Sequence, residues 1–272
     1  SVLTNKANVL FDMEQYNNAA RSIEGGLLIA KQFGYRQPYV SMLSNQALYQ
    51  CMLGGWDEAG QLGERALHLA NHYAMTYLRG VNRHTLGMLA GQAGDLEGCI
   101  ASQSASVRDH VEVNYQDSAR AALCEILIAA NQWLVPYLAR PQMEEHPALL
   151  EGLDEQGGNV HVLSLRTQIA VHGVLCGATP ARSAEKELYG CLQSAVNQRT
   201  LWLQAESGEA LVAVLSLQER DEAACDAGEA LLPALAHHYC PLKVPPFLLT
   251  LASAQERAGR RESLKPVIRA LR

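Results

Sequence analysis

Hydrophobic residues recur at intervals of three and four along most of the chain, which is the spacing of one face of an α-helix. Two clear examples are Leu86, Leu89, Ala90 and Ala93, and Leu211, Val214, Leu215 and Leu217. Strands find little support, because clusters of β-branched residues are few and no Asn-Gly turn separates alternating runs. The pattern therefore predicts an all-α chain.

Short bends separate the helical segments at a fixed interval. The small residue after the bend is Ala19 in YNNA, Ala59 in WDEA and Cys99 in LEGC, so both intervals are 40 residues (59 − 19 and 99 − 59). Weaker bends place Pro136, Ala184, Ala223 and Leu264 in the same position. Self-similarity of this kind is typical of stacked helical arrays. The length accommodates about seven antiparallel helical hairpins.

Each bend combines residues that end or cap a helix with a side chain that covers the turn. Gly, Asn and Asp suit the ends of helices. The predicted covers are Tyr16, Trp56, Leu96 and Trp133. Thr179 before Pro180 predicts an N-cap with proline at the first helical position, and Asp221 predicts a further cap.

Two proline-rich segments interrupt the pattern, at 141–158 and at 241–246. Proline inside a helix costs about 3 kcal/mol, so both are expected to be breaks or connections. Neither needs to be a domain boundary. We expect residues 1–272 to form one solenoid with an irregular connection at 141–158, and the chain to be a fragment of a larger multidomain protein.

The bends and small residues of the first three units resemble the tetratricopeptide repeat. The matching residues are Ala7, Tyr16 and Ala19 in the first unit, Ala47, Trp56, Asp57, Glu58, Ala59 and Ala66 in the second, and Leu86, Gly87, Gly94, Asp95 and Leu96 in the third. The family's usual repeat has 34 residues, and the longer repeat here is similar to those of LuxR-type and other bacterial signal-transducing ATPases and of peptide-sensing regulators. HEAT or armadillo arrays, with repeats of about 40–47 residues, are the structural alternative.

The resemblance implies a right-handed superhelix in which the first helix of each hairpin lines a concave groove. Carried onto this sequence, the groove-facing residues are Asn8, Ser44, His84, Met88, Glu125 and Arg166. The five polar side chains could bind polar groups of a ligand, and Met88 could adapt to apolar parts. The other interpretation is that these residues simply face solvent.

On this basis we expect a module that binds a peptide, a partner protein or a small effector within a bacterial signalling or transcriptional regulator. Ligand contacts across several units would shift the attached domain between two states. A stand-alone assembly scaffold is the alternative. Self-association is also expected, because terminal helices of an array leave apolar faces uncovered.

Composition narrows the classes of partner and the cell compartment. A formal net charge of −6 argues against nucleic-acid binding, which needs clustered Lys and Arg. No apolar run approaches the length of a membrane span. Seven dispersed cysteines form neither a disulfide framework nor a zinc ribbon, so a reducing cytoplasm is expected.

Few residues suggest chemistry. His68 and His72 lie four apart, a spacing that can hold a metal, but no third ligand is evident. The HHYC segment at 237–240 combines His, Tyr and Cys, yet adjacent helical residues point in different directions. Phosphate loops, nucleophile elbows and dinucleotide fingerprints are absent from the sequence. We expect no enzyme, cofactor or metal site, with a metal-dependent enzyme using His68 and His72 as a remote alternative.

Overall fold

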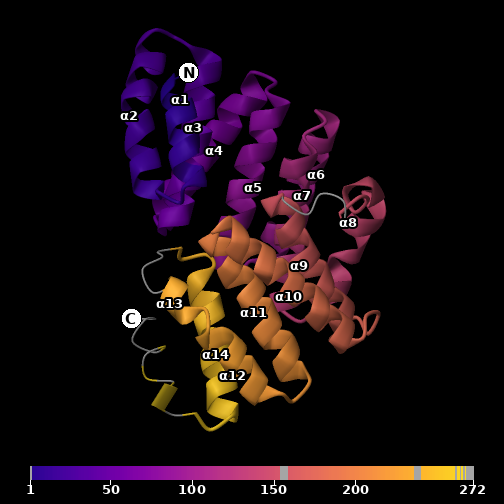
Figure 1. Cartoon of the computed structure of the whole chain (residues 1–272). Helices are drawn as coiled ribbons and strands as arrows, with labels where there is room; N and C mark the ends of the chain where they lie inside the picture. Colours follow the sequence, from indigo (N-terminus) through magenta and orange to yellow (C-terminus); the bar gives the residue numbers. More distant parts are fainter. Residues whose placement is uncertain are drawn as a thin grey trace. The chain divides into compact units, whose positions relative to one another are not determined.

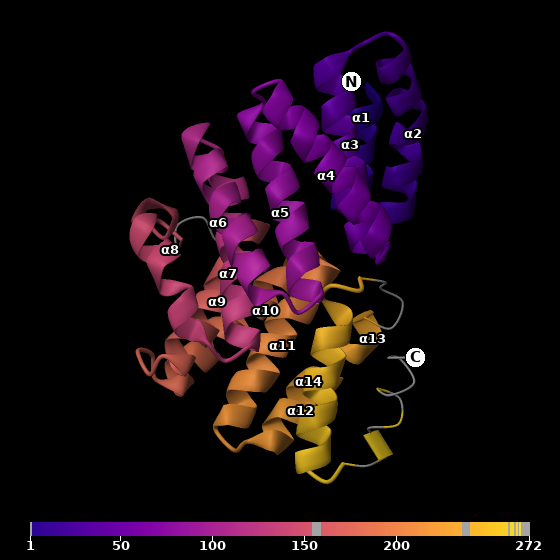
Figure 2. The same ribbon diagram turned by 180° about the vertical axis from the view of Figure 1, so that it is seen from behind.

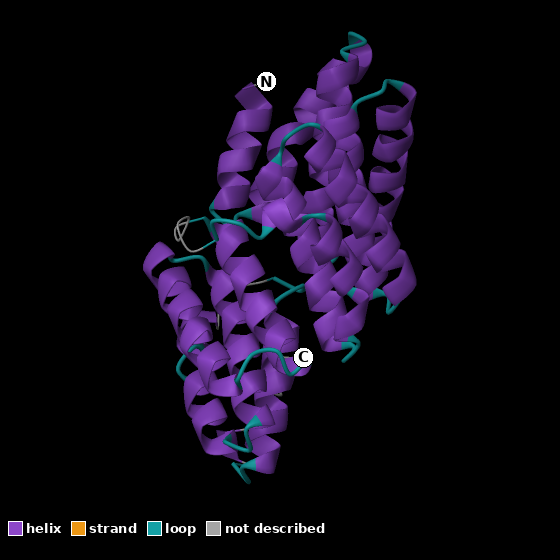
Figure 3. Cartoon of the chain, turned by 90° about the vertical axis from the view of Figure 1, so that its right-hand side faces the viewer, coloured by secondary structure: helices purple, strands orange, loops and turns teal. Residues whose placement is uncertain are grey.

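The computed structural model describes residues 2–153, 159–235 and 240–260, together with Glu262, Ser263, Lys265 and Val267. Every regular element in these ranges is a helix, and none of the described residues forms a strand (Figure 3). Consecutive helices pack against their neighbours in the manner of a helical-repeat array, which confirms the predicted fold class. The chain divides into two compact units, Ser1–Ala129 and Ala130–Arg272.

The first unit is built from antiparallel helices joined by three-residue turns (Figure 1). Its helices are α1 (Val2–Asp12), α2 (Tyr16–Gln32), α3 (Arg36–Leu53), α4 (Trp56–His72), α5 (Thr76–Gln92), α6 (Leu96–Glu112) and most of α7 (Gln116–Gln132). Each of α1 to α6 packs on the next helix in the chain. The predicted hairpins α1–α2, α3–α4 and α5–α6 are therefore present.

The turns between these helices repeat with half the period of the sequence pattern. A left-handed backbone conformation follows each helix, at positions 14, 34, 54, 74, 94, 114 and 134, so the interval is 20 residues throughout (34 − 14). The next residue donates its backbone N–H to the carbonyl five residues earlier, as Gly55 does to Gln50 at 2.9 Å. This is the Schellman arrangement, which satisfies carbonyls that a helix end leaves unpaired. Two such turns make up one 40-residue repeat.

Two glycines of α5 explain how closely α6 approaches it. A Cβ atom on Gly87 would lie 2.7 Å from Nε2 of Gln103, and one on Gly80 would lie 2.8 Å from Cε1 of His110. Asp95 caps α6, because its Oδ1 accepts a hydrogen bond from the backbone N–H of Gly98 at 2.9 Å. The small Gly87 and the capping Asp95 noted in the sequence thus have direct structural roles.

The second unit is less regular (Figure 2). Its elements after α7 are η1 (Pro136–Leu138), α8 (Arg140–Glu145), η2 (Pro147–Leu149), α9 (Val160–Leu175), α10 (Ala181–Gln198), α11 (Leu201–Leu217), α12 (Asp221–Glu229), α13 (Leu232–Leu235) and α14 (Val244–Arg257). The central helix α11 buries residues on all sides, including Leu211 and Leu215, which pack with Phe247 and Leu251 of α14. The core of this unit lies around α11.

The predicted irregular connection is confirmed where it is described, but it begins earlier, at Pro136. Residues 154–158 lie outside the described ranges, as do His237, His238, Tyr239 and Leu264. At the second interruption, Pro245 and Pro246 occupy the first turn of α14, where proline is tolerated. Gly259, with φ +73°, ends α14 at the seventh predicted bend.

Two predicted helix caps are wrong by one residue. Pro180 has ψ 135°, so it lies outside the helix as the N-cap residue of α10, and no side chain caps that helix. Asp221 is the first residue of α12 rather than its cap. Among the predicted covers, Tyr16 is buried against Phe11, at 5.3 Å between ring centroids, whereas Trp56 and Trp133 are exposed. Each cover depends on what its neighbours supply.

Candidate functional site

The residues predicted to face a groove lie on the first helices of the hairpins, as expected, but several of them join neighbouring first helices. Asn8 of α1 accepts hydrogen bonds at its Oδ1 from Nδ2 of Asn45 and from the hydroxyl of Tyr49, both at 3.1 Å. Ser44 of α3 accepts one from Nδ2 of Asn82 at 2.8 Å. Because Ser44 and Asn82 are both fully buried, this contact is part of the core. Ser44 therefore does not reach a surface groove.

The next three predicted residues lie on α5 and α7. Nδ1 of His84 is 2.9 Å from Oε1 of Gln103 on α6. Met88 is buried, so it offers no adaptable apolar surface to a ligand. Glu125 of α7 is partly buried and, after burial itself, contributes to raising the pKa of Cys99 to about 12.

Arg166, in the second unit, lines a depression of about 500 Å³ with Ile169, Thr179 and Ser183. Its Nε donates to Oε1 of Glu187 at 2.6 Å, so the guanidinium bridges α9 and α10. Arg166 and Glu187 lie 21 residues apart, which places this ion pair within one hairpin. The structure does not gather the six predicted residues into one site.

Polar contacts between successive first helices share a sequence signal that could have identified them. The partners are separated by 37 residues in Asn8–Asn45, by 38 in Ser44–Asn82 and by 42 in Ser164–Glu206. These separations are close to the length of the repeat. Polar residues at similar positions of adjacent units therefore indicate contacts between units in the array.

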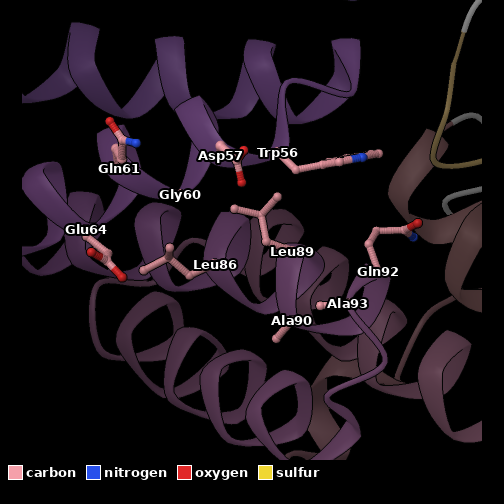
Figure 4. A pocket seen from close by; sticks show the side chains of 10 residues that line it. All are labelled: Trp56, Asp57, Gly60, Gln61, Glu64, Leu86, Leu89, Ala90, Gln92 and Ala93. Atoms are coloured by element: carbon pink, nitrogen blue, oxygen red, sulfur yellow. The ribbon is translucent and has the colours of Figure 1, made fainter.

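A groove between α4 and α5 was not anticipated from the sequence (Figure 4). Its volume is about 670 Å³. The lining residues are Trp56, Asp57, Gly60, Gln61 and Glu64 of α4, Leu86, Leu89, Ala90 and Gln92 of α5, and Ala93 directly after it. All of them belong to the first unit.

The two walls of this groove differ in chemistry. The α5 wall carries Leu86, Leu89 and Ala90, whereas the α4 wall carries the carboxylates Asp57 and Glu64. The lining contains no Lys, Arg or His side chain. A ligand would meet an apolar surface on one side and negative charge on the other.

Gly60 keeps the α4–α5 groove open. The residues one repeat before and after it are Ala20 and Ile100, so larger side chains fit this position of the repeat. A Cβ on Gly60 would meet only Leu89 Cδ1, at 3.9 Å, which is ordinary contact. At Gly63, in contrast, a Cβ would lie 3.2 Å from Leu86. Helix packing therefore demands a small residue at Gly63 but not at Gly60.

The second unit contains a buried group of polar and charged residues around Glu206. Oε1 of Glu206 accepts hydrogen bonds from Ser164 Oγ at 2.5 Å and Gln168 Nε2 at 3.3 Å, and its Oε2 lies 2.8 Å from Nζ of Lys243. Burial raises the pKa of the nearby Glu209 to about 7, against the opposing effect of Lys243. These contacts join α9, α11 and the residue preceding α14.

His68 and His72 are both exposed, and the His72 ring lies edge-on to Tyr73 at 4.7 Å between centroids. Among the described residues, no group of three or more His, Cys, Asp or Glu side chains could hold a metal ion. No described helix combines the length and apolar character that a membrane crossing requires.

The fold defines the chain as an all-α helical-repeat protein. Comparison with known proteins adds no name to this class, because the chain matches no protein-family model and no curated protein.

Proposed function

We propose that this chain is a protein-binding module whose α4–α5 groove receives a segment of a partner protein. The observation that carries the proposal is Gly60. Glycine in a helix interior costs roughly 0.5–1 kcal/mol relative to alanine, and the space beside Gly60 would accept a side chain. A glycine that opens a surface groove without serving helix packing is expected where another molecule approaches the backbone.

The two walls of the groove favour a segment that pairs an apolar side chain with a basic one. Leu86 and Leu89 can bury an aliphatic or aromatic side chain of the partner. Asp57 and Glu64 then lie within the same groove to attract Lys or Arg. The net charge of −6 of the chain works in the same direction, by steering basic segments toward it.

The resemblance of the first three units to bacterial regulators suggests the context in which such binding acts. We propose that the groove belongs to the sensing part of a signalling protein, where occupancy shifts the population of two states. This context depends on the resemblance, whereas the proposed binding mode depends on the groove.

Selection of random displayed peptides against the purified chain tests the proposed binding. We expect enrichment of sequences in which Leu, Ile or Phe is close to Lys or Arg. Titration calorimetry should then show that Gly60→Leu, which fills the groove, weakens a selected peptide by roughly tenfold or more. The double variant Asp57→Asn, Glu64→Gln should weaken basic peptides and increase the relative affinity of neutral ones.

Gly25→Leu is the matched control, because Gly25 is also inside a helix and has no atom within 4 Å of its would-be Cβ. It should leave peptide binding unchanged. Equal affinity of the selected peptides for wild type and Gly60→Leu would show that they do not bind in the groove.

A further inference from the structure

One face of α1 is exposed and largely apolar. Val2, Val9 and Met13 have exposed fractions of 84%, 57% and 60%. Together with Lys6 they are spaced by four, three and four residues, which places them on one face of the helix. We call Val2, Lys6, Val9, Asp12 and Met13 the α1 face, since Lys6 and Asp12 are exposed beside the apolar residues.

The next repeat shows what this face normally does. The residues 40 positions after Val2 and Val9 are Met42 and Tyr49 of α3, with exposed fractions of 3% and 2%. In α3 these positions are covered by the first hairpin, in a cluster that includes Ala7, Ala19 and Ile23. The α1 face thus continues a surface that the array uses to join one repeat to another.

The charges on the α1 face are symmetric about its centre. Lys6 lies three residues before Val9, and Asp12 lies three residues after it. If two α1 helices pack antiparallel across a twofold axis at Val9, Lys6 of each copy lies opposite Asp12 of the other. Such a contact is self-complementary, as an isologous interface must be. It buries Val9 against Val9 and forms two ion pairs at the rim.

We propose that two copies of this chain associate through the α1 face, antiparallel and centred on Val9. The apolar positions supply the buried area, and the Lys6–Asp12 pairs set the register. This inference does not depend on the proposed peptide groove, which lies between α4 and α5.

Sedimentation equilibrium of the whole chain over a range of concentrations tests the proposal. We expect a reversible monomer–dimer equilibrium, which Val9→Asp weakens by roughly tenfold or more because it places two carboxylates at the centre of the contact. Leu28→Asp is the control, because Leu28 of α2 is equally exposed, at 71%, but lies outside the α1 face. It should leave the equilibrium unchanged. Circular dichroism should show that both variants remain folded.

Charge reversal distinguishes this register from non-specific association. Lys6→Glu and Asp12→Lys should each weaken the dimer, because each places like charges opposite one another. The double variant Lys6→Glu, Asp12→Lys should restore the wild-type equilibrium. A chain that stays monomeric, a dimer that survives Val9→Asp, or a double variant as weak as either single variant would overturn the proposal.

Discussion

The two units solve the same packing problem with different chemistry. In the first unit, neutral groups link successive first helices, such as the Asn8 amide with Tyr49 and Ser44 with Asn82. In the second unit, the corresponding link is a buried carboxylate, Glu206, held by Ser164 and Lys243. A neutral hydrogen bond is modest in either direction, whereas a buried charge requires its whole set of partners.

The units also differ in the regularity of their turns. Left-handed turn residues follow one another every 20 positions from 14 to 134, whereas the next ones come at 152, 177, 199, 219 and 259. The Schellman bond is kept in the second unit, as in Thr200 N to Ala195 O at 3.1 Å. The comparison teaches that hairpins of this kind depend on turn geometry and tolerate wide variation in the polar residues between helices.

The sharpest way to test this difference is to remove one partner from each unit. Glu206→Ala leaves the largely buried Lys243 without its carboxylate, so we expect a loss of about 3–5 kcal/mol in unfolding free energy. Ser44→Ala removes one neutral acceptor and should cost about 1–3 kcal/mol. Chemical denaturation measures both. Equal losses would mean that the charge in the second unit is not effectively buried.

Stability should depend on pH with opposite sign in the two units. Burial lowers the pKa of His110 in the first unit to about 4 and raises that of Glu209 in the second to about 7. The native first unit therefore resists protonation and loses stability as pH falls from about 6.5 to 4. The native second unit resists ionisation at Glu209 and loses stability as pH rises from about 4.5 to 7. Each effect amounts to at most about 3 kcal/mol.

Hydrogen exchange at several pH values separates these two effects, because it reports the stability of each segment. Glu209→Gln should flatten the profile of the second unit alone, and His110→Gln that of the first unit alone. If either variant changes both profiles, the two units do not unfold independently.

The close contact of α5 and α6 in the first unit should depend on Gly87. Gly87→Ala places a Cβ 2.7 Å from the Gln103 amide, which is buried and bonded to His84, so we expect a loss of about 1–3 kcal/mol. Gly25→Ala, in open space on α2, should instead stabilise by about 0.5–1 kcal/mol. Thermal unfolding of the two variants measures both effects. A similar change for both would show that helix propensity alone decides.

The smallest effects should come from the turns themselves. Ala74 and Leu134 have left-handed backbone angles, φ 53° and φ 56°, at positions that Gly54 and Gly94 occupy in other turns. Ala74→Gly and Leu134→Gly should each stabilise by about 0.5–1 kcal/mol, and Gly54→Ala should destabilise by a similar amount. Denaturant midpoints resolve changes of this size. Destabilisation by Ala74→Gly would mean that its methyl group packs in the turn.

The repeat and its helices were predictable because their signals are local. Asp95 caps α6 through a bond to a residue three positions away, and the 40-residue period shows in Ala19, Ala59 and Cys99, all buried after their bends. The candidate site was less predictable. Gly60 differs from Ala20 and Ile100 in plain sight, but only the position of Leu89 shows that this difference opens a groove.

The sequence by itself determined that the chain is helical, where most helices begin and end, and the interval at which hairpins recur, because capping and turn formation involve residues a few positions apart. Only the tertiary structure decided that Ser44 and Met88 are buried, that Trp56 borders a groove while Tyr16 is packed, and that Glu206 meets Lys243. Those outcomes depend on side chains about one repeat away, and the helical period alone does not specify which of them fill a given space.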